Sequence, residues 1–249
     1  NYFVRIYLTI EELPKFKKIL IIRLSSLGDI LLTTPFIRSI KNQFPGIEID
    51  FVLREQYSDI LKLNPYLNKV FSFSRIKNDN SEKLKELYNS KYNLVIDLQN
   101  NLRSKKLVSE VRTQSVSFSK NSWNKFLLVN FKINNLKDAP QIPVRYAQTI
   151  TGLKLDEKGL DLFTDKSPSA ELNQKENLIG FCPGARHFTK RWLKEYFIEL
   201  GKKLTANGYT IVLFGGKIDK EICAELANEI RGAINLFNSD DVLQTSADM

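Results

Sequence analysis

The sequence contains few of the residues that most often hold metal ions or disulfide bonds. Its 249 residues include two cysteines, Cys182 and Cys223, and a single histidine, His187. Two scattered cysteines form neither a disulfide framework nor a zinc site, which fits a reducing compartment. A lone histidine excludes a histidine-rich metal centre, so the sequence predicts no bound metal.

Long hydrophobic stretches are also missing. No apolar run approaches the roughly 18 residues that a membrane-spanning helix needs, and we expect no secretory signal. The formal net charge of +9 is spread along the chain, with lysine and arginine mixed among acidic residues. This charge predicts attraction to polyanions and leaves phosphorylated substrates, anionic membranes and nucleic acids open as partners.

Several nucleotide-binding and catalytic motifs are absent. There is no G-x-G-x-x-G after the first predicted strand, no P-loop and no G-x-S-x-G elbow. Their absence argues against a nicotinamide enzyme, a P-loop NTPase and an α/β hydrolase. An Asp-x-Asp pair is missing as well, so the sequence does not suggest a metal-bridged sugar nucleotide.

Predicted strands and helices alternate along the first part of the chain. An apolar run typical of a strand buried on both faces lies at 19–24, and further predicted strands lie at 47–53, 69–73 and 93–98. The alternation predicts right-handed βαβ units and an open parallel sheet. We expect a helix from Ile30 to Phe44 that is kinked at Pro35, and another helix at 144–153.

A second α/β pattern follows a polar stretch. Residues 163–177 show no periodicity and contain Pro168, so we expect a linker there. Strand and helix patterns then resume, with helices expected at 191–208 and 219–230. The sequence therefore predicts an α/β fold of two Rossmann-like, doubly wound domains, 17–165 and 176–249, the second of them incomplete.

One acidic residue, Asp29, lies where the first predicted strand turns into a helix, in the segment SSLGD. Ligands of open α/β sheets bind beyond the carboxyl ends of the strands. Gly28 permits a tight turn, and the positive pole of the next helix favours an ionised carboxylate, which suits a general base. The alternative is that Asp29 only caps the helix, and its position alone favours that interpretation.

A basic turn follows the first strand of the second domain. The segment FCPGARHFTKRW carries Thr189, Lys190 and two arginines before a helix that we expect Trp192 to open. Backbone donors and cations at a helix start can bind phosphate, and the alternative is a solvated basic turn. His187 alone is more typical of a surface residue than of a catalyst.

Two other strand-end turns are candidates for ligand binding. The pair Gly215 and Gly216 lets a ligand approach the backbone closely, although a turn after a strand needs glycine in any case. The loop after 93–98 gathers Asn101, Arg103 and Lys105 with other polar residues. That density of polar groups exceeds what a turn requires.

Three blocks of the sequence resemble one enzyme family. KKILIIRLSSLGDILLTTPFIRSIKNQFPG, LVIDLQNNLRSK and FCPGARHFTKRW are similar to blocks of the lipopolysaccharide heptosyltransferases, family 9 of the glycosyltransferases. The resemblance covers about residues 17–240. The S-S-x-G-D and Lys-x-Trp blocks, in this order and at this separation, are together quite specific.

The resemblance implies a GT-B fold and a role for each block. Asp29 would be the general base that deprotonates the acceptor hydroxyl for an inverting displacement at the anomeric carbon. Lys190, with Thr189 nearby, would bind the diphosphate of the donor, and Gly215 and Gly216 are further candidates for the donor site. The residues implied for the acceptor are Ser25, Ser26, Gly28, Asn101, Arg103 and Lys105. A nucleoside diphosphate leaves as a stable anion, so one base with cationic and backbone donors suffices, without a metal or other cofactor.

The implied function is transfer of a heptose from ADP-heptose to a lipopolysaccharide inner-core acceptor. The implied partners are the nucleotide-sugar donor, a lipid A core-type acceptor and the anionic surface of the inner membrane on its cytoplasmic side, with no nucleic acid. One alternative is a GT-B transferase that uses another sugar nucleotide. From a different class, the chain could be a truncated, non-catalytic module that binds anions or lipid.

One departure from the family pattern affects the donor site. The family's Asp-x-Gly-x-x-His block, which contacts the donor nucleotide, does not occur in this sequence. We therefore expect a chain truncated at its carboxyl end, with an incomplete donor site. Residues 1–16 have no counterpart in the family pattern, and the first residue is Asn1 rather than methionine.

Overall fold

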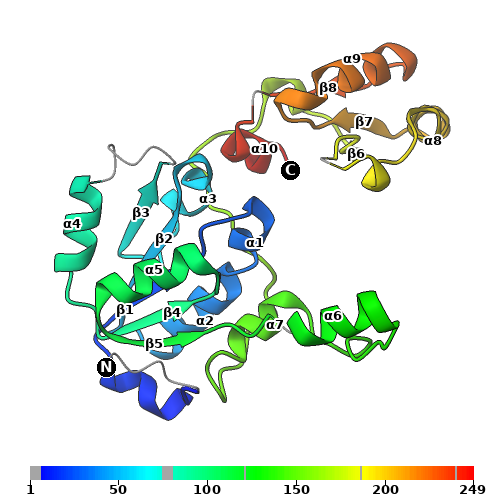
Figure 1. Cartoon of the computed structure of the whole chain (residues 1–249). Coiled ribbons are helices and arrows are strands. Elements are labelled where there is room, and N and C mark those ends of the chain that lie inside the picture. Colours follow the sequence, from blue (N-terminus) through cyan, green and yellow to red (C-terminus); the bar gives the residue numbers. More distant parts are fainter. Residues whose placement is uncertain (1–6, 75–80, 121, 186, 239) are drawn as a thin grey trace. The chain divides into compact units, whose positions relative to one another are not determined.

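The computed structural model describes residues 7–74, 81–120, 122–185, 187–238 and 240–249 (Figure 1). The chain divides into two compact units, Asn1–Leu162 and Phe163–Met249. Each unit is an α/β structure with its own parallel sheet. The two units are therefore described separately.

The sheet of the first unit consists, within the described residues, of parallel strands in the order β3-β2-β1-β4-β5. The strands are β1 (Lys18–Ile22), β2 (Glu48–Arg54), β3 (Lys69–Phe73), β4 (Leu94–Asp97) and β5 (Gln114–Ser117). Ile21 of β1 pairs with Phe51 on one side and with Ile96 on the other. The chain builds outward from β1 in one direction and then returns to add β4 beside it. Ligands of such sheets bind where the order reverses, at the carboxyl ends of β1 and β4.

Helices cover both faces of this sheet (Figure 1). The helices of the described part of this unit are η1 (Ile10–Lys15), α1 (Leu27–Leu31), α2 (Thr34–Gln43), η2 (Glu55–Tyr57), α3 (Asp59–Lys62), α4 (Ser81–Asn89), α5 (Leu102–Val111), α6 (Ser122–Phe131) and α7 (Ile142–Ala147). Side chains from α2 and α7 pack with Ile19 and Ile21 on one face of β1. Side chains from α4 and α5 pack with Leu20 and Ile22 on the other. Burial on both faces explains why the strands read as continuous apolar runs.

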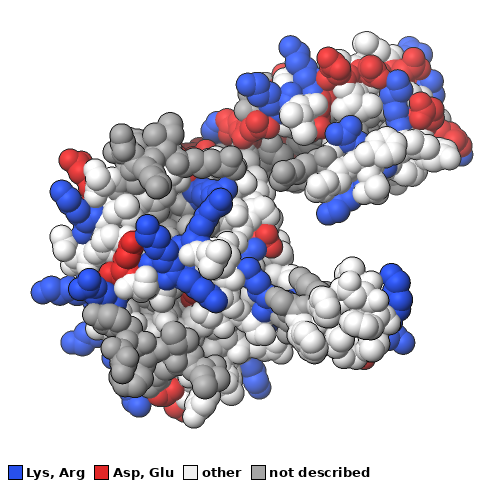
Figure 2. Space-filling model, in the orientation of Figure 1, with Lys and Arg blue, Asp and Glu red and all other residues white. Residues whose placement is uncertain are grey.

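Basic and acidic side chains are interspersed on the surface, as the sequence predicts. On the side drawn in Figure 2, lysine and arginine gather on the first unit around α5, with a few carboxylates among them. On the second unit the two signs alternate more evenly. The cationic excess that attracts polyanions is therefore seen most clearly on the first unit in this view.

The predicted kink at Pro35 is wrong, because the segment forms two helices. The helix α1 ends at Leu31, and α2 begins at Thr34 with Pro35 in its first turn. A proline there lacks only an N–H that would have no partner inside the helix. The helix expected at 144–153 is also shorter than predicted, since α7 ends at Ala147.

The segment before β1 belongs to the first unit, although the sequence predicts a domain that begins at residue 17. Leu8 and Leu13 are fully buried in its core. The Ile10 backbone N–H donates to the Thr151 carbonyl at 2.9 Å, and the Thr151 N–H donates to the Leu8 carbonyl at 2.7 Å. The segment is therefore held against the chain that follows α7, in the same unit.

The second unit has, in its described part, parallel strands in the order β6-β7-β8. Its elements are η4 (Ala170–Leu172), β6 (Leu178–Phe181), η5 (Phe188–Lys190), α8 (Lys194–Ala206), β7 (Thr210–Leu213), η6 (Lys217–Asp219), α9 (Lys220–Glu229), β8 (Ile234–Asn235) and α10 (Val242–Asp248). Phe181, Ile211 and Leu213 pack on one face with side chains of α8 and α9. Val212 and Phe214 pack on the other face with Leu172.

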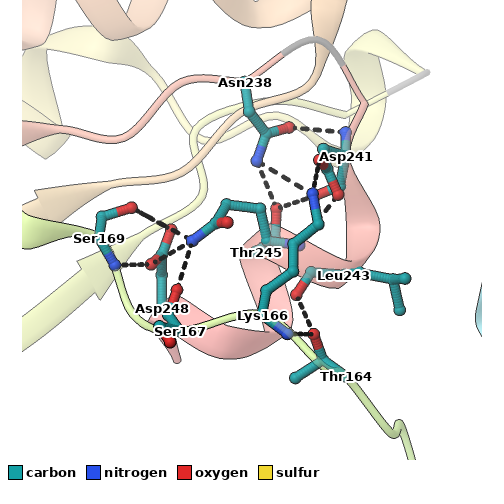
Figure 3. Close-up of polar contacts among 10 residues, drawn as sticks. Thr164, Lys166, Ser167, Ser169, Asn238, Asp241, Leu243, Thr245 and Asp248 are labelled. Carbon is teal, nitrogen blue, oxygen red and sulfur yellow. Dashed lines mark hydrogen bonds and ion pairs between the residues drawn. The ribbon is translucent and has the colours of Figure 1, made fainter.

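Part of the stretch expected as a linker is held against α10 (Figure 3). The Thr164 hydroxyl donates to the Leu243 carbonyl at 3.0 Å, and Lys166 forms an ion pair with Asp241. The Ser169 backbone N–H donates to Asp248 Oδ1 at 2.6 Å. These contacts place residues 164–169 within the second unit.

A buried arginine anchors the end of the first unit. Arg38 on α2 donates to both carboxylate oxygens of Asp156, from Nε at 2.7 Å and from Nη2 at 2.6 Å. It also donates to the Gly159 carbonyl at 3.0 Å and forms an ion pair with Asp161. Hydrogen bonds from Arg38 lower the pKa of Asp156 to about 2. The segment 156–161 is thereby fixed to α2.

Replacing Arg38 should destabilise the first unit strongly. We expect Arg38→Leu to lower the free energy of unfolding by about 3 kcal/mol, because it leaves two carboxylates without their cation. Since the pKa of Asp156 is lowered on folding, its contribution is complete above the unfolded value near 3.9 and is lost as the pH falls towards about 2. Urea unfolding at neutral and acidic pH measures both effects. Asn42→Leu, on the exposed side of α2, is the control and should change stability little.

Candidate active site

Asp29 lies in the first turn of α1, directly after the carboxyl end of β1. Ser26 is the residue that caps this helix, and its backbone is extended. Asp29 Oδ2 accepts hydrogen bonds from the Ser26 backbone N–H at 3.2 Å and from the Ser26 hydroxyl at 2.7 Å. Asp29 and Ser26 therefore form a capping box, so Asp29 supports the helix start without being the cap residue.

Arg23 joins Asp29 to the neighbouring strand. Its Nη2 lies 2.9 Å from Asp29 Oδ2, and its Nη1 donates to the Leu98 carbonyl at 2.7 Å. The guanidinium lies 5.7 Å from the ring centre of Tyr146, and only 9% of the side chain is exposed. The sequence prediction missed both Arg23 and Tyr146. The available signal for Arg23 was a charge inside the apolar run ILIIRL, because buried charges need partners.

The contacts of Asp29 keep its carboxylate ionised. Partial burial raises the pKa of Asp29, but the hydrogen bonds from Ser26 and the charge of Arg23 outweigh it, so the pKa is below its ordinary value. The Ser26 backbone N–H, the Ser26 hydroxyl and the Arg23 guanidinium all contact the same oxygen, Oδ2. Among the described residues, Oδ1 has no hydrogen-bond partner, and 36% of the side chain is exposed. One carboxylate oxygen is therefore free to receive a proton from a ligand.

The turn after β4 is tied to the turn after β1. Gln99 is buried, and its Oε1 accepts from the backbone N–H groups of Leu24 at 3.0 Å and Ser25 at 3.1 Å. Asp97 is buried as well and accepts from the Gln99 backbone N–H at 2.9 Å and the Ser104 hydroxyl at 2.7 Å. Burial raises the pKa of Asp97. These groups shape the two turns from within rather than facing a ligand.

The predicted acceptor residues of α5 divide into one structural residue and two exposed cations. Asn101 caps α5, and its side-chain oxygen accepts from the backbone N–H groups of Arg103 and Ser104, both at 3.0 Å. Arg103 and Lys105 are exposed. Arg103 lines a cavity of about 610 Å³, together with Arg54, Lys106, Glu110, Leu24, Phe73 and Tyr88. The structure brings Arg103, but not Lys105, to this cavity.

The turn at Gly28 does not depend on the conformational freedom of glycine. Its backbone is helical and shows no positive φ, so the turn itself does not require glycine. A Cβ atom added at Gly28 would meet no other atom within 4 Å. Ser25 is half-buried and Ser26 is exposed beside it. The space next to Asp29 is therefore open to a ligand.

The basic turn of the second unit differs from the expected helix start. Thr189 and Lys190 lie in the short η5 helix and are exposed, whereas α8 begins only at Lys194. Trp192 therefore does not open the helix as predicted. Of the predicted cations, Arg191 donates from Nε to the Ala185 carbonyl at 2.8 Å, and Arg186 lies outside the described residues. Arg191 and Lys194 line a cavity of about 320 Å³ that Thr189 and Lys190 do not line.

Three glycines of the second unit, Gly184, Gly215 and Gly216, pack around Asp219, a carboxylate that the sequence prediction missed. A Cβ at Gly215 would lie 2.7 Å from Cys223 Sγ and 2.9 Å from Asp219 Cβ, and one at Gly184 would lie 2.1 Å from Asp219 Oδ1. The Gly216 backbone N–H donates to Asp219 Oδ2 at 3.1 Å. Close packing therefore accounts for these glycines whether or not a ligand binds there.

Neither a metal centre nor a membrane-spanning helix is found among the residues that the structure describes. No group of three or more His, Cys, Asp or Glu side chains is arranged to hold a metal ion there. No helix within the described ranges is long and apolar enough to cross a membrane. The candidate site consists of Asp29 with Arg23 and the open space beside them.

The fold is similar to that of a solved enzyme. The structure of Escherichia coli ADP-heptose LPS heptosyltransferase II matches 93% of this chain and 76% of its own with a TM-score of 0.67, at 22% sequence identity. Together with the parallel sheets of the two units, this likeness defines an α/β fold of the GT-B type with Rossmann-like units. The fold class predicted from the sequence is confirmed.

The sequence then assigns the family. The sequence model of glycosyltransferase family 9 (heptosyltransferase) matches residues 82–239. The chain belongs to glycosyltransferase family 9, as its sequence blocks predict, and is therefore a glycosyltransferase.

Curated relatives agree with this assignment. Lipooligosaccharide heptosyltransferase 2 of Haemophilus ducreyi is 26% identical over 91% of this chain and 73% of its own length. Lipopolysaccharide heptosyltransferase 1 of Pseudomonas aeruginosa is 25% identical over 87% of this chain. The chain spans 66% of the length of that second relative.

Removing the Ser26 hydroxyl should separate helix capping from the charge of Asp29. We expect Ser26→Ala to lower the free energy of unfolding by about 1 kcal/mol, because a capping hydrogen bond is lost. The same change should raise the pKa of Asp29 towards its ordinary value, which carboxyl NMR titration measures. Because the folded pKa is lowered, the stability it contributes is lost as the pH falls through it. Ser25→Ala is the matched control, and an equal shift there would contradict the capping box.

Proposed function

We propose that the protein transfers a heptose from ADP-heptose to a hydroxyl group of a lipopolysaccharide inner-core acceptor, with inversion at the anomeric carbon. The observation that carries this proposal is the ionised carboxylate of Asp29 beside open space at the carboxyl end of β1, in a chain of family 9. The names of its relatives support the substrates, since these are lipooligosaccharide and lipopolysaccharide heptosyltransferases, and the E. coli enzyme is named for ADP-heptose.

Asp29 is the general base of this reaction. The acceptor hydroxyl donates its proton to Oδ1 while its oxygen forms a bond to the anomeric carbon, and the electron pair of the breaking bond leaves with the diphosphate. A carboxylate of lowered pKa is a weak base. The attacking oxygen becomes more acidic as its bond to carbon forms, so proton transfer late in the step suits such a base. Arg23 positions the carboxylate by holding Oδ2.

Basic side chains of the first unit bind the acceptor. Arg54, Arg103 and Lys106 line the cavity beside Leu24, close to the turn that leads to Asp29. Guanidinium and ammonium groups bind the phosphate and carboxylate groups of an acidic sugar acceptor. Lys105 adds to the same cationic surface of α5. In the second unit, Thr189 and Lys190 hold the diphosphate, and the turn of Gly215 and Gly216 lies at the donor.

The protein works at an anionic membrane surface on the cytoplasmic side, where the lipid-linked acceptor is made. The net charge of +9 supports this attachment. Electrostatic binding of this kind weakens as salt rises past physiological strength, where the screening length is about 8 Å or less.

The test of the donor compares nucleotide sugars. The intact protein is incubated with a lipid A core acceptor and with ADP-heptose, a UDP-sugar or a GDP-sugar, and product formation is measured. Turnover with ADP-heptose alone supports the proposal. Turnover with another sugar nucleotide would assign a different transferase, and binding without any turnover would assign a non-catalytic module.

Substituting Asp29 tests its role as base. We expect Asp29→Asn to lower turnover by roughly 10²- to 10⁴-fold, because no carboxylate remains to take the proton of the attacking hydroxyl. The substitution also removes the ion pair with Arg23, so unfolding is measured in parallel and activity is compared where both proteins are folded. Ser26→Ala disturbs the same helix start without removing the carboxylate and should lower turnover far less than Asp29→Asn does. Turnover of Asp29→Asn within about threefold of the parent would exclude Asp29 as the base.

Substituting Lys190 tests the donor side. We expect Lys190→Ala to lower kcat/KM for the nucleotide sugar by about 10- to 100-fold, the loss of one charge-assisted hydrogen bond. Lys202→Ala is the matched control, because Lys202 is an exposed lysine of the same unit that pairs with Glu229. Equal kinetics for Lys190→Ala and the parent would contradict a role of Lys190 in donor binding and favour a solvated basic turn.

A further inference from the structure

The helix α6 presents an unusual apolar surface to water. Six of its eight described side chains are apolar, a composition typical of a largely buried helix. Yet large apolar side chains on α6 and just after it are exposed: Trp123 by 69%, Phe126 by 47%, Val129 by 68%, Phe131 by 61% and Ile133 by 49%. Contiguous apolar patches of this kind mark interaction sites.

The aromatic rings of α6 pack on one another rather than on the core of the unit. The rings of Trp123 and Phe126 stack with centres 5.5 Å apart, and those of Phe126 and Phe131 meet edge to face at 5.9 Å. Figure 1 shows α6 standing away from the sheet of the first unit, beyond α7. The surface over it is largely uncharged on the side drawn in Figure 2, with basic side chains at its margin.

The charges that surround α6 in sequence have one sign. From Val111 to Lys137 the chain contains no aspartate or glutamate. The same stretch carries the cations Arg112, Lys120, Lys125, Lys132 and Lys137. Elsewhere acidic and basic residues are mixed. An aromatic and aliphatic surface whose neighbouring charges in the sequence are basic complements an anionic bilayer, in which phosphate groups lie above acyl chains.

We propose that α6 is the membrane-docking element of the protein. Trp123, Phe126, Val129 and Phe131 enter the boundary between headgroups and acyl chains of an anionic membrane, and the surrounding lysines contact lipid phosphates. This inference rests on the proposed function, since a lipid-linked acceptor requires that the first unit work at a membrane surface. A second copy of the chain fits less well, because a two-fold interface through α6 would bring the basic residues of one copy against those of the other, and like charges repel.

The two tryptophans of the chain allow a direct test. Trp123 is on α6 and Trp192 is in the second unit. In a Trp192→Phe variant, fluorescence comes from Trp123 alone, and in a Trp123→Phe variant it comes from Trp192. Each variant is titrated with phosphatidylcholine vesicles, with and without phosphatidylglycerol, whose acyl chains carry bromine as a quencher. We expect quenching of Trp123 by the anionic vesicles and none of Trp192.

Charge substitutions on α6 extend the test to function. We expect the double variant Phe126→Glu, Val129→Glu to bind anionic vesicles at least about tenfold more weakly, because apolar contact is lost and negative charge is added. Its turnover should fall on acceptor embedded in vesicles but not on a water-soluble core fragment. Tyr7→Glu is the control, since Tyr7 is 71% exposed and lies outside α6.

The outcomes separate this inference from the proposed function. Vesicle binding without quenching of Trp123 would overturn the role of α6 and leave membrane attachment to another surface. Absence of vesicle binding, with turnover on the soluble fragment, would overturn membrane docking and keep the glycosyl transfer. A dimer that the double variant converts to monomers would assign the patch to a second copy.

Discussion

A buried guanidinium holds together the parts of the first unit that form the candidate site. Arg23, at the end of β1, reaches the Leu98 carbonyl beyond β4, the Asp29 carboxylate in α1 and the Tyr146 ring in α7. A charge with so little exposure is stable only when its partners stay in place, so these elements are fixed relative to one another. The ionisation of Asp29 is therefore a property of the fold as well as of the residue. Because β1 and β4 are parallel neighbours, their carboxyl ends lie side by side, which brings Arg23 and Leu98 together.

The sequence predicts the architecture well where the signal is local. Strands buried on both faces require continuous apolar runs, and such runs mark β1, β2 and β4 directly. Boundaries that depend on tertiary contacts are predicted poorly. The packing of Leu8 against the core and the hydrogen bonds of 164–169 to α10 join residues that are far apart in the chain. Pro35 ends one helix pattern and starts another, and a proline reads the same in sequence whether it kinks a helix or opens one.

The candidate site is predicted in position but not in its internal chemistry. Asp29 is found because ligands bind at strand ends, and that rule needs only the strand and the turn. Arg23 and Tyr146 are separated by most of the first unit, and their contact is set by how α7 packs. Glycine is the least informative signal, because Gly28 faces open space while Gly215 packs against Asp219 and Cys223. The same residue type thus serves two opposite needs.

The contacts between residues 164–169 and α10 have a consequence for synthesis on the ribosome. The first unit contains its own core and needs no side chain from beyond Leu162 to complete it, so it can fold while later residues are still being added. In the second unit, Ser169 can form its hydrogen bond to Asp248 only after nearly all of that unit has been synthesised. Closing so long a loop comes late and carries an entropic cost. During translation, the start of the second unit is therefore exposed to proteases and chaperones for longer than any part of the finished first unit.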